Sequence, residues 1–288
     1  MPETVLTQIS PHVYWLPPGP PDRPSLCAVV GGDHTLLLDA GSSPTHVRPL
    51  VAGLAALGAP PLRYVALTHW HWDHVFGAAA VGVPVIAHRL TADRLAVMAG
   101  YDWNDAALEA RVQAGTEIIG CASDIKIELP EPRQVTIAVP EIVFDTALEL
   151  RLGGGITCRM QHVGGDHSPD SAVMFVEPDG VLFLGDCLCE GSGYEPARCY
   201  TRRRLYPLLE TLYGFNPQLV VEGHLSTVTP RAEFDALAAK MRLAGRLVEQ
   251  LGADEAAVLA AAQAQTGQMP DDELREIVQA FIIGRAFE

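Results

Sequence analysis

A buried strand in this sequence ends directly in a cluster of histidines. Residues 64–67 (Tyr-Val-Ala-Leu) predict the strand, and residues 68–74 (Thr-His-Trp-His-Trp-Asp-His) follow without a break. Alternate side chains of an extended segment share a face, so His69 and His71 are expected to point the same way. The turn after them is expected to present Asp73 and a further histidine to the same space.

These histidines indicate a metal site. Neutral imidazole and carboxylate oxygen are the ligands that zinc and other borderline divalent metals prefer. A polar turn with solvated histidines is the alternative. Trp70 and Trp72 argue against it because they predict a partly enclosed pocket, although both could instead pack in the core.

The composition describes an acidic, globular chain. It has 288 residues, 48% of them hydrophobic, and a formal net charge of −15. This length is enough to bury a sizeable core. The negative charge repels phosphate backbones, so we expect no nucleic-acid partner.

The sequence also predicts where the chain resides. No apolar run approaches the roughly 20 residues needed to cross a bilayer, so we expect no membrane partner. The N-terminus lacks a basic segment followed by an apolar one, which would mark a secretory signal. The widely spaced cysteines fit reduced thiols. We therefore expect a cytoplasmic protein.

Strand and helix patterns alternate along the chain. A helix is expected over residues 44–58, and residues 90–134 predict a helical insertion that covers a site. From residue 230 onward the chain is expected to be helical, either covering the core or forming a homodimer contact or a substrate-channel wall. Strands are expected over residues 13–16, 26–30, 35–39, 63–67, 83–87, 134–139, 147–152, 156–160, 172–176 and 181–184.

Four further ionisable residues follow apolar or glycine-rich segments. Asp39 is expected either to support the histidine cluster or to cap the next turn. His167, Asp186 and His224 are weak signals singly. Together with the cluster they supply five histidines and two aspartates, which is the complement for two metals.

The order of these motifs resembles the metallo-β-lactamase superfamily. His-x-His-x-Asp-His is followed by a histidine in a glycine-rich loop, a Gly-Asp and a late Gly-His, over roughly residues 10–228. The resemblance implies an α/β fold, the αββα four-layer sandwich, with the metals at one edge of the two sheets. We therefore predict a catalytic domain over residues 1–229, with the insertion at about 90–134. A C-terminal helical extension over residues 230–288 is expected to pack on it.

The resemblance also implies the ligands of two divalent ions. The loop from His162 to His167 carries an extra Asp166, and we assign His167 as the ligand. Zinc is expected, with iron or manganese as alternatives. The first metal would be held by His69, His71 and His167, the second by Asp73, His74 and His224, with Asp186 bridging them.

This arrangement predicts hydrolysis. The two metals would generate a bridging hydroxide, with Asp73 and Asp186 as the catalytic carboxylates. His74 and Asp186 together argue against a true β-lactamase, and the acidity argues against a nuclease. We favour an ester, thioester or lactone of a small molecule.

Several alternatives stay open at this point. A phosphodiesterase or β-lactam-type hydrolase of the same fold is one, and a low-turnover regulatory or sensor protein is another. Tyr194 and Tyr200, in the loop after Asp186, are expected either to lie on the surface or to donate to a developing oxyanion.

Overall fold

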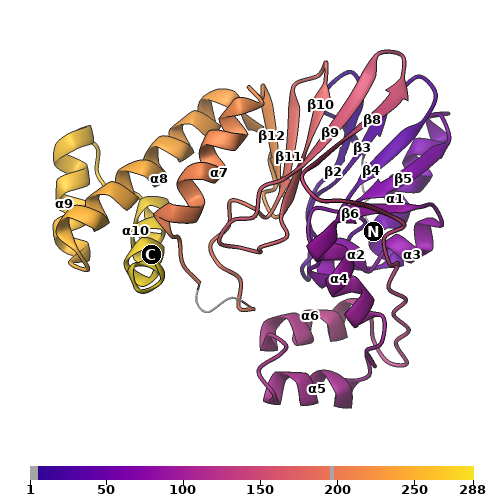
Figure 1. Cartoon of the computed structure of the whole chain (residues 1–288), viewed down its shortest axis with the longest axis horizontal. Coiled ribbons are helices and arrows are strands. Elements are labelled where there is room, and N and C mark those ends of the chain that lie inside the picture. Colours follow the sequence, from indigo (N-terminus) through magenta and orange to yellow (C-terminus); the bar gives the residue numbers. More distant parts are fainter. Residues whose placement is uncertain (1–5, 195–197) are drawn as a thin grey trace.

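Two packed β-sheets form the centre of the molecule in this computed structural model, which describes residues 6–194 and 198–288. The first sheet has seven strands in the order β1-β2-β3-β4-β5-β6-β7, and the second has six in the order β13-β12-β11-β10-β9-β8. Helices cover the outer face of each sheet (Figure 1). The structure therefore has the expected αββα sandwich.

The strands are mostly short. The first sheet contains β1 (Thr7–Gln8), β2 (Val13–Leu16), β3 (Leu26–Val30), β4 (Thr35–Leu38), β5 (Leu62–Ala66), β6 (Val85–His88) and β7 (Ile142–Phe144). The second contains β8 (Ala147–Gly153), β9 (Ile156–His162), β10 (Ala172–Glu177), β11 (Val181–Gly185), β12 (Leu219–Glu222) and β13 (Thr229–Pro230). The first four strands pair antiparallel, and β4 to β7 pair parallel.

Ten α-helices lie among the described residues. They are α1 (Pro44–Ala56), α2 (Trp72–Val75), α3 (Ala78–Val81), α4 (Arg89–Met98), α5 (Asp105–Gln113), α6 (Ile119–Glu128), α7 (Arg202–Gly214), α8 (Arg231–Leu251), α9 (Glu255–Thr266) and α10 (Asp272–Gly284). Helix α1 begins as the sequence predicts, because the Ser43 side chain accepts a hydrogen bond from the His46 amide and Pro44 occupies the first turn. No helix of this described part is long and apolar enough to cross a membrane.

The apolar runs of the sequence are buried on both faces of the sheets. In β3, Leu26 and Ala28 face the helices, whereas Cys27 and Val29 face the other sheet. This follows from the two-residue repeat of a strand. Phe183 of β11 is fully buried between the sheets, so truncating it to alanine would cost about 3–5 kcal/mol.

The strand expected over residues 134–139 is wrong. This segment forms no regular strand, and β7 begins only at Ile142. Val135 and Ile137 are half-buried against the helical layer of the first sheet, so their alternation reflects packing on helices. Residues 134–136 line a small hollow together with Ala79 and Ala80 of α3.

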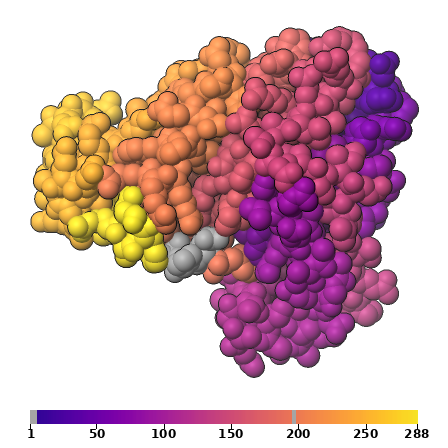
Figure 2. All heavy atoms as spheres, in the orientation of Figure 1, coloured from indigo at the N-terminus to yellow at the C-terminus, as the bar shows by residue number. Residues whose placement is uncertain are grey.

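Two helical segments extend from the sandwich in different directions. Helices α5 and α6 belong to the predicted insertion and lie beyond α4, whereas α8, α9 and α10 extend from the second sheet (Figures 1 and 2). One continuous apolar cluster joins the outer face of β10, β11 and β12 to α7 and the C-terminal helices. The domain boundary at residues 229/230 stays a prediction.

Candidate metal centre

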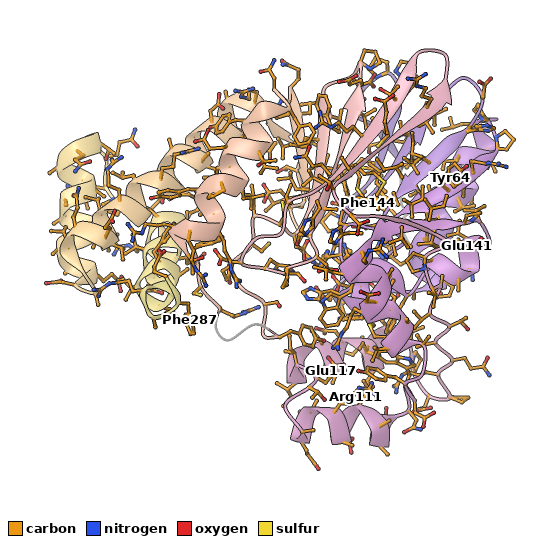
Figure 3. The ribbon with its side chains drawn as sticks, in the orientation of Figure 1. Tyr64, Arg111, Glu117, Glu141, Phe144 and Phe287 are labelled. Carbon is orange, nitrogen blue, oxygen red and sulfur yellow. The ribbon has the colours of Figure 1, made fainter. Side chains whose placement is uncertain are left out.

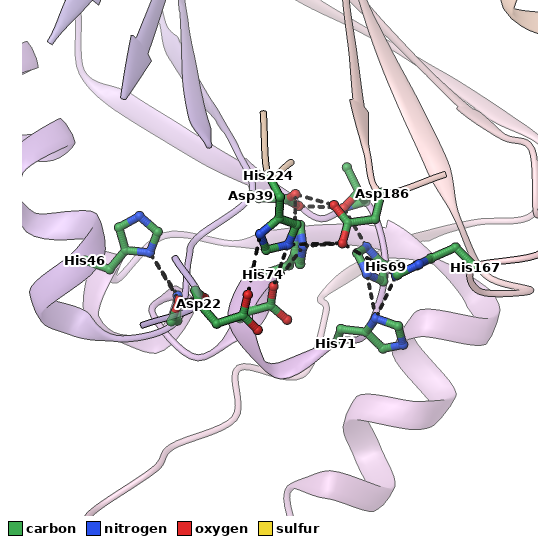
Figure 4. A network of polar contacts seen from close by, with 12 residues as sticks. Asp22, Asp39, His46, His69, His71, His74, His167, Asp186 and His224 are labelled. Atoms are coloured by element: carbon green, nitrogen blue, oxygen red, sulfur yellow. Dashed lines mark hydrogen bonds and ion pairs between the residues drawn. The ribbon is translucent and has the colours of Figure 1, made fainter. Parts of the chain in front are cut away.

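The first sheet supplies four of the seven predicted site residues. Strand β5 ends at Ala66, and the loop after it carries His69 and His71. Helix α2 starts at the next residue and places Asp73 and His74 in its single turn. Residues 67–71 form a loop that belongs to no strand, with an extended backbone at His71 (φ −58°, ψ 143°), and both loop imidazoles point into the site (Figure 4).

The second sheet supplies the other three residues. His167 lies in the turn between β9 and β10, Asp186 directly follows β11, and His224 lies two residues after β12. Sheet topology brings β11 and β12 side by side as parallel neighbours, so their carboxyl ends meet at one edge. The structure thus brings all seven predicted side chains into two adjoining groups.

The first group consists of three imidazole nitrogens. Nε2 of His69 and Nε2 of His167 each lie 3.0 Å from Nδ1 of His71. A neutral imidazole nitrogen carries either one proton or one lone pair, so Nδ1 of His71 cannot satisfy both neighbours with hydrogen bonds. Three nitrogens this close match the donors of a tetrahedral zinc ion, whose Zn–N bonds are about 2.0–2.1 Å.

The second group mixes carboxylates and imidazoles. Oδ2 of Asp73 lies 3.2 Å from Nε2 of His74 and 3.3 Å from Nε2 of His224. Oδ2 of Asp186 lies 3.4 Å and 3.3 Å from the same two nitrogens. Four donor atoms of hard and borderline character therefore surround one point, and they could hold a divalent cation.

Asp186 connects the two groups. Its Oδ2 atom, 3.3–3.4 Å from the nitrogens of the second group, also lies 3.5 Å from Nε2 of His167 in the first. The side chain is 5% exposed. One carboxylate oxygen thus stands between two donor sets, as a bridging ligand must.

These residues fit a site for divalent metal ions. Nε2 of His74 is buried and has no hydrogen-bond partner among the described residues. An unpartnered buried polar atom is costly, and a metal ion between His74, Asp73 and Asp186 would satisfy this one.

The remaining nitrogens of four histidines are held by neighbouring groups. Nδ1 of His74 lies 2.7 Å from Oδ2 of Asp39, and Nδ1 of His69 lies 3.0 Å from Oγ1 of Thr68. Asp39 also accepts hydrogen bonds from the amide and hydroxyl of Thr68 at 2.7 and 2.8 Å. Asp39 therefore supports the histidine cluster, which was one of its two expected roles.

The other two partners were not anticipated from the sequence. Nδ1 of His167 lies 3.3 Å from the carbonyl oxygen of Glu190, and Nδ1 of His224 lies 3.5 Å from Oδ1 of Asp22. Such contacts orient a histidine so that its second nitrogen faces a metal. Asp22 lies in a proline-rich loop with no periodic pattern, so no local signal marks it.

The electrostatic environments of the two groups differ. Burial, reinforced by the neighbouring imidazoles, holds the pKa values of His69 and His71 well below the usual value, so both stay neutral. For His74, burial is outweighed by Asp73, Asp186 and Asp39, and its pKa lies well above the usual value. Neutral imidazoles bind metals directly, whereas the second group would release a proton on binding.

A cavity of about 640 Å³ opens onto this centre. Asp22 and Tyr194 are among its lining residues. The helical insertion contributes Ile118, Cys121 and Asp124 to the wall. The insertion therefore contributes part of the cavity wall, and its role as a cover stays a prediction.

Tyr194 ties this wall to the opposite loop. Its hydroxyl donates a hydrogen bond to Glu117, and its ring lies 4.6 Å from the ring of Trp70. Glu117 also faces Arg111, with 3.8 Å between Oε2 and Nε (Figure 3). The Tyr194 hydroxyl is therefore engaged by a carboxylate and does not point freely into the cavity.

The other aromatic residues have structural roles. Tyr200 is buried and donates to the carbonyl of Leu188, so its expected surface position is wrong. Trp72 packs in the core of the first sheet, and Trp70 lies edge to face against His71. Trp70 thus supports a site imidazole without lining the cavity among the described residues.

The structure separates the two histidines of the glycine-rich loop. His167 joins the metal centre, whereas His162 stacks on His88 with ring centroids 3.8 Å apart. Asp166 accepts hydrogen bonds from the amide and hydroxyl of Thr201, both at 2.7 Å. The extra residue of this loop therefore ties it to the start of α7.

Solved structures show the same fold. A metallo-beta-lactamase from Pontibacter korlensis is 19% identical, with a TM-score of 0.58 over 82% of this chain and 97% of that one. The DIM-1 metallo-beta-lactamase is 14% identical, with a TM-score of 0.56 over 83% and 96%. A metallo-beta-lactamase family protein from Thermus thermophilus is 19% identical, with a TM-score of 0.58 over 97% and 95%.

Sequence comparison identifies the family. No curated protein matches this chain. The family model described as the metallo-beta-lactamase superfamily matches residues 20–203, which include six of the seven residues of the centre. Members of this superfamily are mainly metal-dependent hydrolases, and the histidine and aspartate groups are suited to divalent metal ions. The chain belongs to the metallo-beta-lactamase superfamily.

Proposed function

We propose that this protein is a dinuclear metal-dependent hydrolase that cleaves an ester, thioester or lactone of a small molecule. The observation that carries the proposal is the position of Asp186, whose Oδ2 lies within 3.5 Å of nitrogens from both donor groups. In this assignment His69, His71 and His167 hold one ion, and Asp73, His74 and His224 hold the other.

Zinc is the metal we propose. Imidazole and carboxylate donors without a thiolate among the seven residues suit zinc, with iron and manganese as alternatives. When bound by these residues, two divalent ions would lower the pKa of a shared water and polarise the carbonyl of the substrate.

The residues of the chain position the reaction. Oδ2 of Asp186 lies within 3.5 Å of nitrogens of both groups, Oδ2 of Asp73 lies 3.2 and 3.3 Å from two nitrogens of the second group, and ionised carboxylates accept hydrogen bonds only. We assign them the catalytic role of orienting the attacking water through these oxygens. For Asp186, burial is outweighed by His74 and His224, which hold its pKa well below the usual value and keep it ionised.

The cavity walls favour acyl substrates over phosphodiesters. Asp22, Asp124 and Glu190 line the cavity in addition to the proposed ligands, and Arg198 is the one basic residue of the described wall. Carboxylates repel a phosphodiester, whereas a neutral ester or lactone avoids this repulsion. A β-lactam-type hydrolase or a low-turnover sensor protein remains the second candidate.

The sequence predicts two partners, a small-molecule substrate and a second copy of the chain. Both remain proposals.

Turnover of a substrate panel tests the proposal. Protein reconstituted with zinc is assayed against aryl esters, thioesters, lactones, a β-lactam and bis(p-nitrophenyl) phosphate. We expect turnover of at least one acyl class and little of the phosphodiester. Preferential phosphodiester cleavage, or no turnover by a fully loaded protein, would contradict the proposed activity.

A further inference from the structure

A second cavity adjoins the one that opens onto the metal centre. It encloses about 370 Å³ between the loop after β11, the end of β12 and helices α8 and α10. The two cavities share Cys189, Glu190 and Arg198 as lining residues. The two cavities are therefore direct neighbours with part of their walls in common.

The wall of the second cavity combines apolar and acidic groups. Leu188, Met241 and Ile277 are buried apolar residues of this wall, and Ala280 lies beside them. The acidic groups of the same wall are Glu190, Glu222, Glu273 and Glu276. Arg198 is the one basic side chain of this described wall, so carboxylates dominate its charge.

Glu222 lines this cavity and carries an unpartnered oxygen beneath the cavity surface. It is the last residue of β12, and its Oε1 atom is buried without a hydrogen-bond partner among the described residues. A buried carboxylate oxygen without a donor is costly and is satisfied when a ligand brings an N–H group. This oxygen is therefore an unsatisfied hydrogen-bond acceptor.

The other carboxylates of the wall differ in their partners. Glu273 forms an ion pair with Lys240, whose Nζ also lies 2.8 Å from Asp271. Glu190 and Glu276 form no ion pair among the residues that the structure describes. Two carboxylates besides Glu222 are thus available to a cationic ligand.

We propose that the second cavity binds a primary ammonium group that the substrate carries on an apolar arm. An ammonium supplies three N–H donors and one positive charge, which match Glu222 and the unpaired carboxylates. The apolar arm packs on the surface formed by Leu188, Met241 and Ile277. The proposal rests on the proposed hydrolase function because it names the class of substrate that the metal centre acts on.

Binding of a simple amine tests this site without any turnover. Calorimetry on zinc-reconstituted protein compares hexylammonium with 1-hexanol and hexyltrimethylammonium. We expect hexylammonium to bind about tenfold more tightly than either, since hexanol lacks the charge and the trimethyl compound lacks the donors. Equal affinity for hexylammonium and hexanol would overturn the proposal.

Matched variants locate the binding site. Glu276→Gln removes one charge from the wall and Glu222→Gln replaces a buried carboxyl group by an amide, and each is expected to weaken hexylammonium binding several-fold. Asp272→Asn removes one charge from the same helix, α10, at an exposed position outside the cavity, and should leave binding unchanged. If only Asp272→Asn loses binding, or if no variant does, the ammonium group does not bind in the second cavity. If Glu222→Gln does not fold, Glu276→Gln alone tests the location of the binding site.

A pair of esters tests whether the ammonium belongs to the substrate. The p-nitrophenyl ester of 6-aminohexanoate carries an ammonium where the heptanoate ester carries a methyl group. We expect a kcat/KM about tenfold higher for the cationic ester and competitive inhibition of both by hexylammonium. Equal kcat/KM values for the two esters, or non-competitive inhibition by hexylammonium, would overturn the substrate assignment. If neither ester is cleaved, the result counts against the hydrolase function, and the calorimetry alone tests the cation site.

Discussion

Nδ1 of His74 lies 2.7 Å from Oδ2 of Asp39, and both side chains are fully buried. This contact fixes the ring so that Nε2 faces Asp73 and Asp186. Asp39 sits at a positive φ of 59°, a conformation that asparagine also tolerates. Asp39→Asn should therefore keep the fold and weaken zinc binding by about 10–100-fold.

Competition with a chromophoric chelator measures this affinity. Asp145→Asn is the matched control, because Asp145 forms an exposed ion pair with Arg89 away from the centre. Equal zinc affinity in wild type and Asp39→Asn would show that Asp39 does not support the metal site.

Removing a proposed ligand should abolish hydrolysis but not folding. For His71→Ala and Asp186→Ala we expect kcat to fall by at least about a thousandfold, because metal assistance contributes several kcal/mol. His162→Ala is the control, since His162 stacks on His88 outside the centre. Circular dichroism checks the fold, and unchanged rates in both ligand variants would refute the assignment.

The hydrogen bond from Tyr194 to Glu117 should control access to the cavity. Tyr194→Phe removes the link between the loop after β11 and the helical insertion, and we expect KM to rise about tenfold with kcat nearly constant. Tyr64→Phe, in β5, serves as the control for loss of a phenol. A KM equal to wild type would show that this link does not hold the cavity wall.

His46 should make stability depend on pH. Burial, followed by the charge of Arg23, lowers its folded-state pKa to about 3, against 6.5 for the unfolded chain. Between these values the unfolded state binds the extra proton, so stability is lost as the pH falls below 6.5.

Urea unfolding at pH 7 and pH 5 measures this contribution. His46 should account for about 2 kcal/mol of the loss in unfolding free energy between the two pH values. His46→Gln keeps an acceptor for the amide of Ser42, which donates to Nδ1 at 3.1 Å, and should show a smaller loss. The same loss in the variant would mean that His46 is protonated in the folded state.

Most strands and helices of the sandwich could be located in the sequence because the strands are apolar on both faces. Runs such as residues 26–30 and 181–184 show burial directly, and helices such as residues 44–56 show a helical repeat. A strand was wrongly predicted over residues 134–139 because alternating apolar residues can also pack on helices. Local alternation does not distinguish these two environments.

The candidate site was predictable only where its residues form a local motif. His69, His71, Asp73 and His74 lie together in the sequence, and the superfamily resemblance extends the set to His167, Asp186 and His224. Asp22, Glu190 and Tyr194 act through contacts between distant segments. Asp22 reaches His224 across some 200 positions of the chain, and no local pattern encodes such a contact.

The number of divalent ions bound per chain tests the central claim most directly. Wild-type protein and the Asp186→Ala variant are loaded with zinc and freed of excess metal. Inductively coupled plasma mass spectrometry then measures the bound zinc. We predict about two zinc ions per wild-type chain and about one or fewer in Asp186→Ala. A wild-type protein that binds none, or a variant that retains both, would contradict a centre built around Asp186.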